Sequence, residues 1–363
     1  MLMLRSFFLL GLAAWLLAAA PESGFVAQSD GAEFHNNNIP QVARLGDGRL
    51  LCVFGVSPKS GPSGRVYGAF SADGARTWSK PQLLFSSQEY FFGDANILVD
   101  GDKVFVYATR VTRPNRIEKA WTFVIRSGDN GQTWSQPEEI HIPRQYTPGK
   151  QHNGIVLADG TYAMGISWDL WAEQGMAART EGEMVLASGL LKSRDGLRWT
   201  LHGNLTTFIP KMTPGSTNGL CEPAIVQLAD GEIWMVLRSG GSHHWESRSV
   251  DGGATWSEPR PSVLVGHNTP TALLRLAGLP HVVAAWNQSP VNRFPLVIAI
   301  SADGGRKFST PKVLANPIGY QASYPGLTQT RDGVIVAVWQ QQRPDGGRDV
   351  RWARLTREWL EQE

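Results

Sequence analysis

Alternating apolar and polar residues occur along the chain in pairs of short runs, and a tight turn joins the two runs of each pair. Five pairs have Asp-Gly at the turn; they cover residues 39–54, 95–108, 154–167, 223–237 and 325–339. A sixth pair, residues 271–286, has Ala277 and Gly278 at that place. Asp-Gly between alternating apolar runs is the strongest short-range signal for a β-hairpin. The pattern therefore predicts six hairpins and an all-β protein.

A polar turn motif recurs between the hairpins. Its copies are SADGARTW (71–78), SGDNGQTW (127–134), SRDGLRW (193–199), SVDGGATW (249–256) and SADGGRKF (301–308). Because Asp and Ser side chains bond nearby backbone amides in turns, we expect structural roles for Asp73, Asp129, Asp195, Asp251 and Asp303. Neighbouring aspartates of this set are 52 to 66 residues apart, enough for four short strands with their turns. The repeat predicts a six-bladed β-propeller of four-stranded antiparallel sheets.

The last sheet of this propeller lacks a strand at its C-terminal end. The segment RDVRWARL (348–355) is its third strand, and REWLEQE after it resembles a short polar helix. Residues Phe25 to Gln28 offer an apolar strand from the other end of the chain, which would close the ring and cover an exposed edge. We therefore expect a single propeller domain over residues 24–363.

The N-terminus has the pattern of a secretory signal peptide. Arg5 is followed by an uncharged apolar run from Phe7 to Leu17 and then by three small alanines, Ala18 to Ala20. A membrane anchor is the alternative, but the apolar stretch falls short of the roughly 20 residues that span a bilayer. We expect residues 1–20 to be removed and the mature protein to be secreted or periplasmic, without stable membrane insertion.

Composition excludes several classes of protein. The 34 basic and 32 acidic side chains give a formal net charge of +2, so no electrostatic argument favours a nucleic-acid partner. With two cysteines, Cys52 and Cys221, a disulfide scaffold is excluded, and we expect buried free thiols. The spacing of His, Cys, Asp and Glu matches no metal motif, and no phosphate-binding loop is present; we therefore expect neither metal nor cofactor in the site, with a structural calcium bound by turn carboxylates as the alternative.

Aligning the hairpins places one polar residue at the start of each innermost strand. These residues are Asn38, Asp94, His152, Glu222, Asn268 and Tyr324. Polar groups that converge on a propeller channel are typical of a small-molecule site. Each also has a local interpretation: the asparagines as strand caps, the histidine as a hydrogen-bonded core residue and Asp94 as a turn acid. The alignment predicts a site at one end of the channel.

Two arginines lie where strands are expected. Arg238 ends the apolar run IWMVL, and Arg293 directly precedes FPLVIAIS. A guanidinium keeps its charge when buried, so an arginine at the end of a core strand usually has an anionic partner or ligand. A salt bridge to a nearby carboxylate is the alternative. Together with Glu222 and Tyr324, these arginines suggest recognition of a carboxylate-bearing ligand.

The order Glu222, Arg238, Arg293, Tyr324, together with the turn motifs, resembles the sialidase superfamily, whose repeats are called Asp boxes. The match covers roughly residues 34–356 and includes CEPAIVQLADGEIWMVLRS and SYPGLTQTRDG. The resemblance implies a retaining glycoside hydrolase with Tyr324 as nucleophile and Glu222 as the acceptor of its proton. It further implies that Arg238 and Arg293 bind the carboxylate of a sialic acid or of another acidic sugar.

The first hairpin departs from the family pattern in two places. Where sialidases have Arg-Ile-Pro, this chain has Asn38-Ile39-Pro40, and the loop over residues 55–65 lacks the acid/base aspartate. Asp94 is our candidate for the general acid, with Asp169 and Glu173 as alternatives. We consider two functions: hydrolysis of a terminal sialic acid or another acidic or deoxy sugar, and carbohydrate binding without catalysis. Asn38, His152 and Asn268 are further candidate substrate-binding residues.

Overall fold

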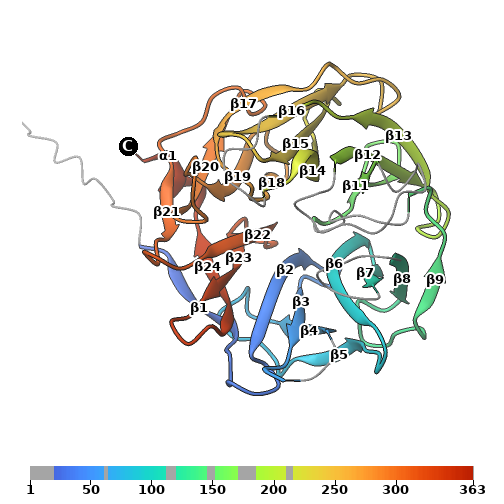
Figure 1. The fold of residues 1–363 in the computed structure, drawn as a ribbon, viewed down its shortest axis with the longest axis vertical. Helices are drawn as coiled ribbons and strands as arrows, with labels where there is room; N and C mark the ends of the chain where they lie inside the picture. The colour runs from blue at the N-terminus through green and yellow to red at the C-terminus, as the bar shows by residue number, and fades with distance from the viewer. Residues whose placement is uncertain are drawn as a thin grey trace, which may run out of the picture.

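The computed structural model describes residues 20–60, 64–111, 120–144, 152–170, 185–209 and 216–362. The described part is almost entirely β-strand, with one short helix, α1 (Arg357–Glu361), near the C-terminal end. Sheets of four strands follow one another around a central axis, as the colour gradient in Figure 1 shows. This is the arrangement of a β-propeller.

Consecutive strands pair antiparallel in groups of three or four. Short parallel pairings join β24 to β2 and β12 to β14, so that four of these groups merge into two eight-stranded sheets. These antiparallel groups are called sheets below. In chain order they are β2 (Asn36–Arg44), β3 (Leu50–Ser57), β4 (Arg65–Ser71) and β5 (Gln82–Phe85); β6 (Phe91–Asp100), β7 (Lys103–Val111), β8 (Ala120–Ser127) and β9 (Glu138–Ile140); β10 (Ile155–Val156), β11 (Tyr162–Asp169), β12 (Val185–Ser193) and β13 (Thr200–Leu205); β14 (Asn218–Gln227), β15 (Ile233–Ser239), β16 (His243–Ser249) and β17 (Arg260–Val265); β18 (Ala272–Arg275), β19 (Val282–Asn287), β20 (Leu296–Ser301) and β21 (Lys312–Ala315); and β22 (Ala322–Gln329), β23 (Ile335–Gln342) and β24 (Arg348–Leu355). All the predicted hairpins are present, including the one that turns at Ala277 and Gly278 between β18 and β19.

The innermost strands form a closed ring. Strand β6 contacts β2 and β10, β14 contacts β11, which is the partner of β10, β18 contacts β14 and β22, and β22 returns to contact β2. At this last seam the buried side chain of Gln340 accepts a hydrogen bond from the backbone of Ile39 (2.9 Å) and donates one to Ser323 (3.3 Å). One amide thus connects the first sheet to the last beside the mouth of the ring.

Both ends of the described chain build the last sheet. Strand β1 (Glu22–Ala27) pairs antiparallel with β24, and the expected pairing of the two chain ends is thereby confirmed. The strand begins at Glu22, two residues before the predicted start of the domain. Val26 is buried in the same cluster as Val350 and Trp352. Ser29 adds a hydrogen bond of 2.7 Å from its backbone to the Asp349 carboxylate. The predicted signal segment lies outside the described residues, except for Ala20.

The turn motifs have the structural role that their sequence predicts. In the first copy, the Asp73 carboxylate accepts hydrogen bonds from the Thr77 backbone (2.9 Å), the Thr77 hydroxyl (2.6 Å) and Ser71 (2.9 Å). The second copy repeats this set around Asp129, and hydrogen bonds, led by that from Thr133, lower the pKa of Asp129 to about 2. These carboxylates therefore hold their own turns.

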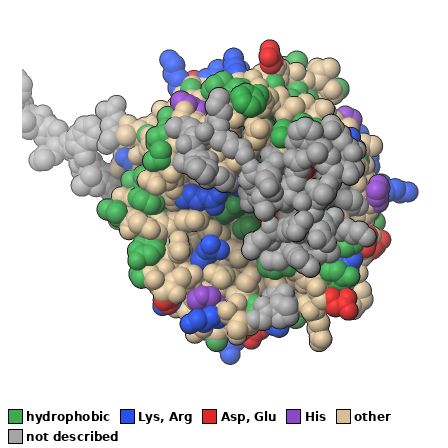
Figure 2. All heavy atoms as spheres, viewed as in Figure 1, with side chains coloured by type: hydrophobic (Ala, Val, Ile, Leu, Met, Phe, Trp, Pro, Cys, Tyr) green, Lys and Arg blue, Asp and Glu red, His purple; other side chains and the backbone are tan. Residues whose placement is uncertain are grey.

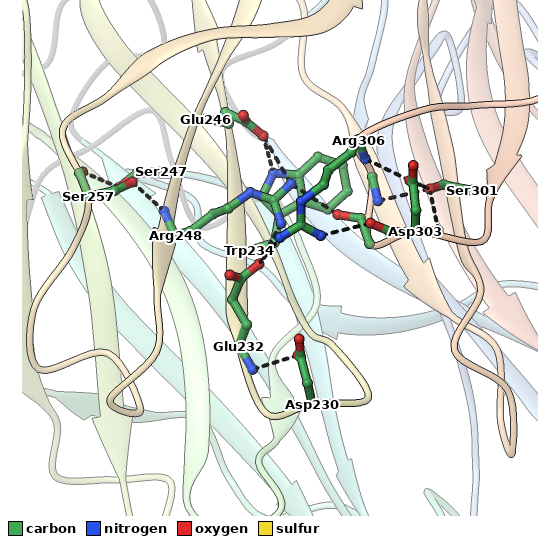
Figure 3. Close-up of polar contacts among 12 residues, drawn as sticks. Asp230, Glu232, Trp234, Glu246, Ser247, Arg248, Ser257, Ser301, Asp303 and Arg306 are labelled. Atoms are coloured by element: carbon green, nitrogen blue, oxygen red, sulfur yellow. Dashed lines mark hydrogen bonds and ion pairs between the residues drawn. The ribbon is translucent and has the colours of Figure 1, made fainter.

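A charged cluster joins the sheet of β14–β17 to the next sheet (Figure 3). The Arg248 guanidinium lies over the Trp234 ring, 4.9 Å from its centroid, and pairs with Glu232 (2.5 Å) and Glu246 (3.1 Å). It also donates to the backbone of Gly304 in the neighbouring turn motif, at 3.0 Å. This arginine is therefore charge-balanced by two carboxylates.

Candidate active site at the mouth of the ring

A β-bulge near the start of the innermost strands positions the candidate residues. In β2, β6, β14 and β22 the pairing skips two residues, and the first of the two has a positive φ: 50° at Ile39, 51° at Asp94, 46° at Glu222 and 56° at Tyr324. Asn268, ahead of β18, has the same conformation at 51°. Non-glycine residues rarely adopt this region, and they cluster at functional sites. The shared geometry defines equivalent positions around the ring.

This geometry corrects the alignment at Asn38. The residue equivalent to Tyr324 is Ile39, so Asn38 lies one position too early. The Asn38 amide oxygen instead lies against the backbone of Gly55, where an added Cβ would come within 2.5 Å of it. The alignment failed because a bulge inserts a residue into the strand, and sequence alternation does not reveal which residue is the extra one.

Glu222 and Arg238 form a buried ion pair. Their side chains are only 1% and 2% exposed, and Arg238 Nη1 donates to Glu222 Oε1 over 2.6 Å. Arg238 also donates twice to the Asn268 amide oxygen, at 3.0 and 2.8 Å. The second carboxylate oxygen of Glu222, Oε2, is buried and has no hydrogen-bond partner among the described residues. That oxygen keeps its lone pairs available for a further hydrogen bond.

Arg293 and Tyr324 lie against each other beside this pair. The Arg293 guanidinium stands 5.6 Å from the centroid of the Tyr324 ring and donates to the Asn268 carbonyl at 2.8 Å. Its own carbonyl accepts from Ala322, two residues before Tyr324, at 3.0 Å. Three predicted residues, Arg238, Asn268 and Arg293, therefore form one connected group, and Glu222 and Tyr324 flank it.

Sequence reasoning missed Arg348, which begins β24. Its guanidinium interacts electrostatically with both Tyr324 and Arg293. Burial lowers the pKa of Arg348; the Tyr324 phenol raises it, and the positive charge of Arg293 lowers it further. Its only signal in the sequence is its place at the start of the segment RDVRWARL (348–355), which contains two further arginines. No sequence motif distinguishes it from the other arginines of that segment.

The candidate acids have different surroundings. Asp94 is partly exposed at its bulge in β6. Asp169, at the end of β11, is 5% exposed and accepts a hydrogen bond from the Val185 backbone at 3.3 Å. Glu173 lies outside the described residues. Of the two described acids, Asp94 occupies a position equivalent to those of Tyr324 and Glu222.

His152 belongs to the wall of the central channel. It is 7% exposed and lines a cavity of about 260 Å³ together with residues from β2, β6, β10, β14, β18 and β22. Burial lowers the pKa of His152 to about 4, so the ring is neutral at physiological pH. Its Nε2 atom has no hydrogen-bond partner among the described residues. The cavity runs toward the Asp-Gly ends of the strands, away from the bulges.

The surface in Figure 2 shows where charge lies on the face viewed in Figure 1. Lys and Arg side chains stand beside a hollow near the centre of this face, over the region of β22–β24. Across the described ranges, no helix has the length and apolar character to cross a membrane. The same ranges contain no group of three or more His, Cys, Asp or Glu side chains suited to a metal ion.

Comparison with known proteins places this geometry in context. A family model described as a BNR repeat-like domain matches residues 65–338. A sialidase from Bacteroides fragilis (strain YCH46) is 23% identical over 336 residues, covering 80% of this chain and 57% of that protein.

Solved structures share the fold. A protein of unknown function from Dyadobacter fermentans DSM 18053 has a TM-score of 0.73 at 19% identity, with 92% of this chain and 97% of the other covered. Trypanosoma rangeli sialidase in complex with sialic acid has a TM-score of 0.71 at 14% identity, with 94% and 60% covered. The chain therefore spans about three fifths of the Bacteroides fragilis and Trypanosoma rangeli proteins.

Proposed function

Because the chain belongs to the BNR repeat-like domain family and is a sialidase-like protein, we propose that it is a retaining exo-glycoside hydrolase. Its substrate is a glycan that ends in a sialic acid or in another acidic or deoxy sugar. The observation that carries the proposal is the grouping of Glu222, Tyr324 and Arg293 at the mouth of the ring, with Glu222 Oε2 free to accept a proton.

The first half-reaction forms a covalent intermediate. The Tyr324 phenol oxygen attacks the anomeric carbon, and its proton passes to Glu222. The bond from the anomeric carbon to the leaving oxygen breaks, and that oxygen receives a proton from Asp94. A neutral phenol suits a sugar whose anomeric carbon bears a carboxylate, because an anionic nucleophile would be repelled by it.

The second half-reaction restores the enzyme. Asp94, now ionised, takes a proton from water as the water oxygen attacks the anomeric carbon on the face that the aglycone left. The bond to Tyr324 breaks, and the phenol oxygen recovers its proton from Glu222. The sugar leaves with the configuration it had in the substrate. The two acids lie on opposite sides of Tyr324 around the ring: Asp94 is two sheets away in one direction, and Glu222 is two sheets away in the other. This arrangement suits one acid that protonates the leaving group and another that accepts the proton of the nucleophile.

Finer features of the protein belong to the same proposal. We infer six blades, one for each hairpin, with β1 completing the blade of β22–β24. These blades form a single domain over residues 24–363. Residues 1–20 act as a signal peptide, so the mature chain works outside the cytoplasm, in the periplasm or the medium.

Release of an aryl aglycone by the purified mature chain tests the function. The panel contains α-sialosides, aryl glycosides of other acidic sugars and neutral deoxy sugars. We expect one of them to be turned over and Tyr324→Phe, which keeps the ring and removes the hydroxyl, to abolish its turnover. Turnover that survives Tyr324→Phe would contradict the assigned nucleophile.

The second function, carbohydrate binding without catalysis, is favoured by one observation. The loop over residues 55–65 has no carboxylate where the family places its acid, and loss of a general acid costs about 10² to 10⁴ in rate. Silence across the glycoside panel, with saccharide binding retained, would establish this function instead. Asp94→Asn separates the two: it abolishes turnover if Asp94 is the acid and leaves binding intact in both cases.

A further inference from the structure

The seam between the last and first sheets carries an arginine that the family pattern does not assign. Arg348 forms a parallel bridge with Asn36, and its carbonyl accepts a hydrogen bond from the buried Asn37 side chain at 3.0 Å. Its backbone is therefore fixed next to β2, within two residues of Asn38. The backbone of Arg348 is thus two residues from the position at which sialidases have their first arginine, and its guanidinium interacts with Tyr324 and Arg293 at the same end of the ring.

Strand register puts Arg348 on the side of the sheet that faces this seam. Arg348 pairs with Gln342, and two residues further Val350 pairs with Gln340. The Gln340 amide bonds Ile39 across the seam and Ser323 within its own sheet. Residues two apart in a strand share a face. Arg348 therefore shares the seam face with Gln340, next to Ser323 and Tyr324.

Two arginines here carry charge that no carboxylate balances. Arg348 Nε is buried without a hydrogen-bond partner, and its guanidinium forms no ion pair with a described residue. Arg293 donates to a carbonyl and stacks on Tyr324, again without a carboxylate partner among the described residues. Arg238, by contrast, is neutralised by Glu222. Like charges that interact without a counter-ion favour an anion between them.

We propose that Arg348 and Arg293 together form the carboxylate-binding pair of this site, with Arg348 supplying the second guanidinium that Asn38 cannot. The inference rests on the proposed function for its location, and it names the substrate class: a sugar bearing a carboxylate. The role of Arg238 is then to hold Glu222. Two guanidiniums can bind the two oxygens of one carboxylate with charge-assisted hydrogen bonds.

Binding of acidic sugars and their neutral methyl esters tests the proposal. Calorimetric titration at fixed ionic strength uses N-acetylneuraminate, glucuronate and galacturonate, each beside its methyl ester. We expect the wild type to prefer at least one acid over its ester, and Arg348→Gln to weaken binding of that acid about tenfold with little effect on the ester. Arg348→Lys keeps the charge and should recover part of the loss.

Arg343→Gln is the matched control, because Arg343 lies in the loop that leads into β24 and already interacts with Asp345 and Asp349. It removes the same charge and should leave acid binding unchanged. Equal binding of acid and ester by the wild type, or equal losses for Arg348→Gln and Arg343→Gln, would overturn the inference. Thermal unfolding of Arg348→Gln shows whether the variant is folded, and if it is not, Arg348→Lys with the same ligand pair decides.

The outcomes also separate this inference from the proposed function. A wild type that binds acids through Arg348 but cleaves no glycoside contradicts the hydrolase and keeps the carboxylate pair. Turnover of a neutral deoxy sugar, unchanged by Arg348→Gln, contradicts the carboxylate pair and keeps the hydrolase.

Discussion

Arg238 and Glu222 are linked by a 2.6 Å ion pair although both side chains are almost completely buried. Removing one partner of such a pair strands the other charge in a medium that solvates it poorly, which costs about 3 to 5 kcal/mol. We expect Glu222→Gln to lower the free energy of unfolding by about that amount, measured by chemical denaturation.

The control for this prediction is the exposed pair Arg198 and Asp195. Asp195 anchors its own turn as well, so Arg198→Gln is the cleaner change there, and it should cost less than 1 kcal/mol. A second variant, Glu222→Leu combined with Arg238→Met, removes both charges and should be more stable than Glu222→Gln alone. Equal midpoint denaturant concentrations for Glu222→Gln and the wild type would contradict the prediction, because they would mean that the change leaves no unpaired charge in the interior.

Strand β1 provides a second test, of stability. Deleting residues 22–29 removes the burial of Val26 and Ala27 and the bond from Ser29 to Asp349, so we expect a lower melting temperature and aggregation through the uncovered edge of β24. Calorimetry and light scattering report the two effects. A chain that starts at Pro21 is the control and should melt with the full-length protein.

Gly24 gives a point-mutation version of that experiment. A Cβ at this position would lie 2.9 Å from the Trp352 ring, and the Gly24 carbonyl accepts from Arg351 at 3.1 Å. Gly24→Val should lower the melting temperature, whereas Ser23→Val, one residue earlier on the other side of the strand, should change it little. Equal melting temperatures for both variants and the wild type would mean that β1 packs loosely.

The turn motif at Asp73 predicts a pH-dependent contribution to the stability of the folded protein. Partial burial raises the pKa of Asp73, but hydrogen bonds from Thr77 and Ser71 outweigh it and lower the pKa to about 2. Because the folded-state pKa lies below the unfolded one, the stabilisation is complete above about pH 4 and is lost as the pH falls toward 2. Asp73→Ala should cost about 1 kcal/mol at pH 7, from lost hydrogen bonds, and much less near pH 2.5.

Two buried histidines predict acid sensitivity at milder pH. Burial lowers the pKa of His152 to about 4, and burial with the nearby charges of His243 and Arg238 lowers that of His244 to about 3. In the unfolded chain the pKa of each histidine is near 6.5. The free energy of unfolding is therefore at its full value above that pH and falls as the pH drops toward 4, by up to about 1.4 kcal/mol per pH unit for each histidine.

Melting temperatures between pH 7.5 and pH 5 measure this slope. The His244 ring nitrogens bond no described residue, so His244→Leu removes a titrating group without removing a hydrogen bond, and its pH dependence should be flatter than that of the wild type. His141→Gln changes an exposed histidine and should keep the wild-type slope. A wild type equally stable at both pH values would mean that the histidines are hydrated.

The hairpins and turn motifs were predictable because both depend on residues close in sequence. Asp-Gly between apolar runs located β2 and β3, and the Ser71–Asp73–Thr77 bonds formed as their spacing implies. The site was predictable only in part. The hairpin pattern locates Glu222, Arg238 and Tyr324, because each lies at an end of a predicted hairpin. Arg348 reaches the site through a seam between strands more than 300 residues apart in sequence, and no local pattern encodes that contact.

The seam also affects how the protein folds. Pairing β1 with β24 brings together residues at opposite ends of the sequence, and contacts of such high sequence separation are slow to form because a long loop must close first. Until β24 is synthesised, β1 has no partner strand, and the edge of β2 that will lie against β24 is uncovered. A nascent chain therefore has two unprotected strands throughout translation. The last step of ring closure is thus the stage at which a chaperone, or a second nascent chain, competes most strongly for it.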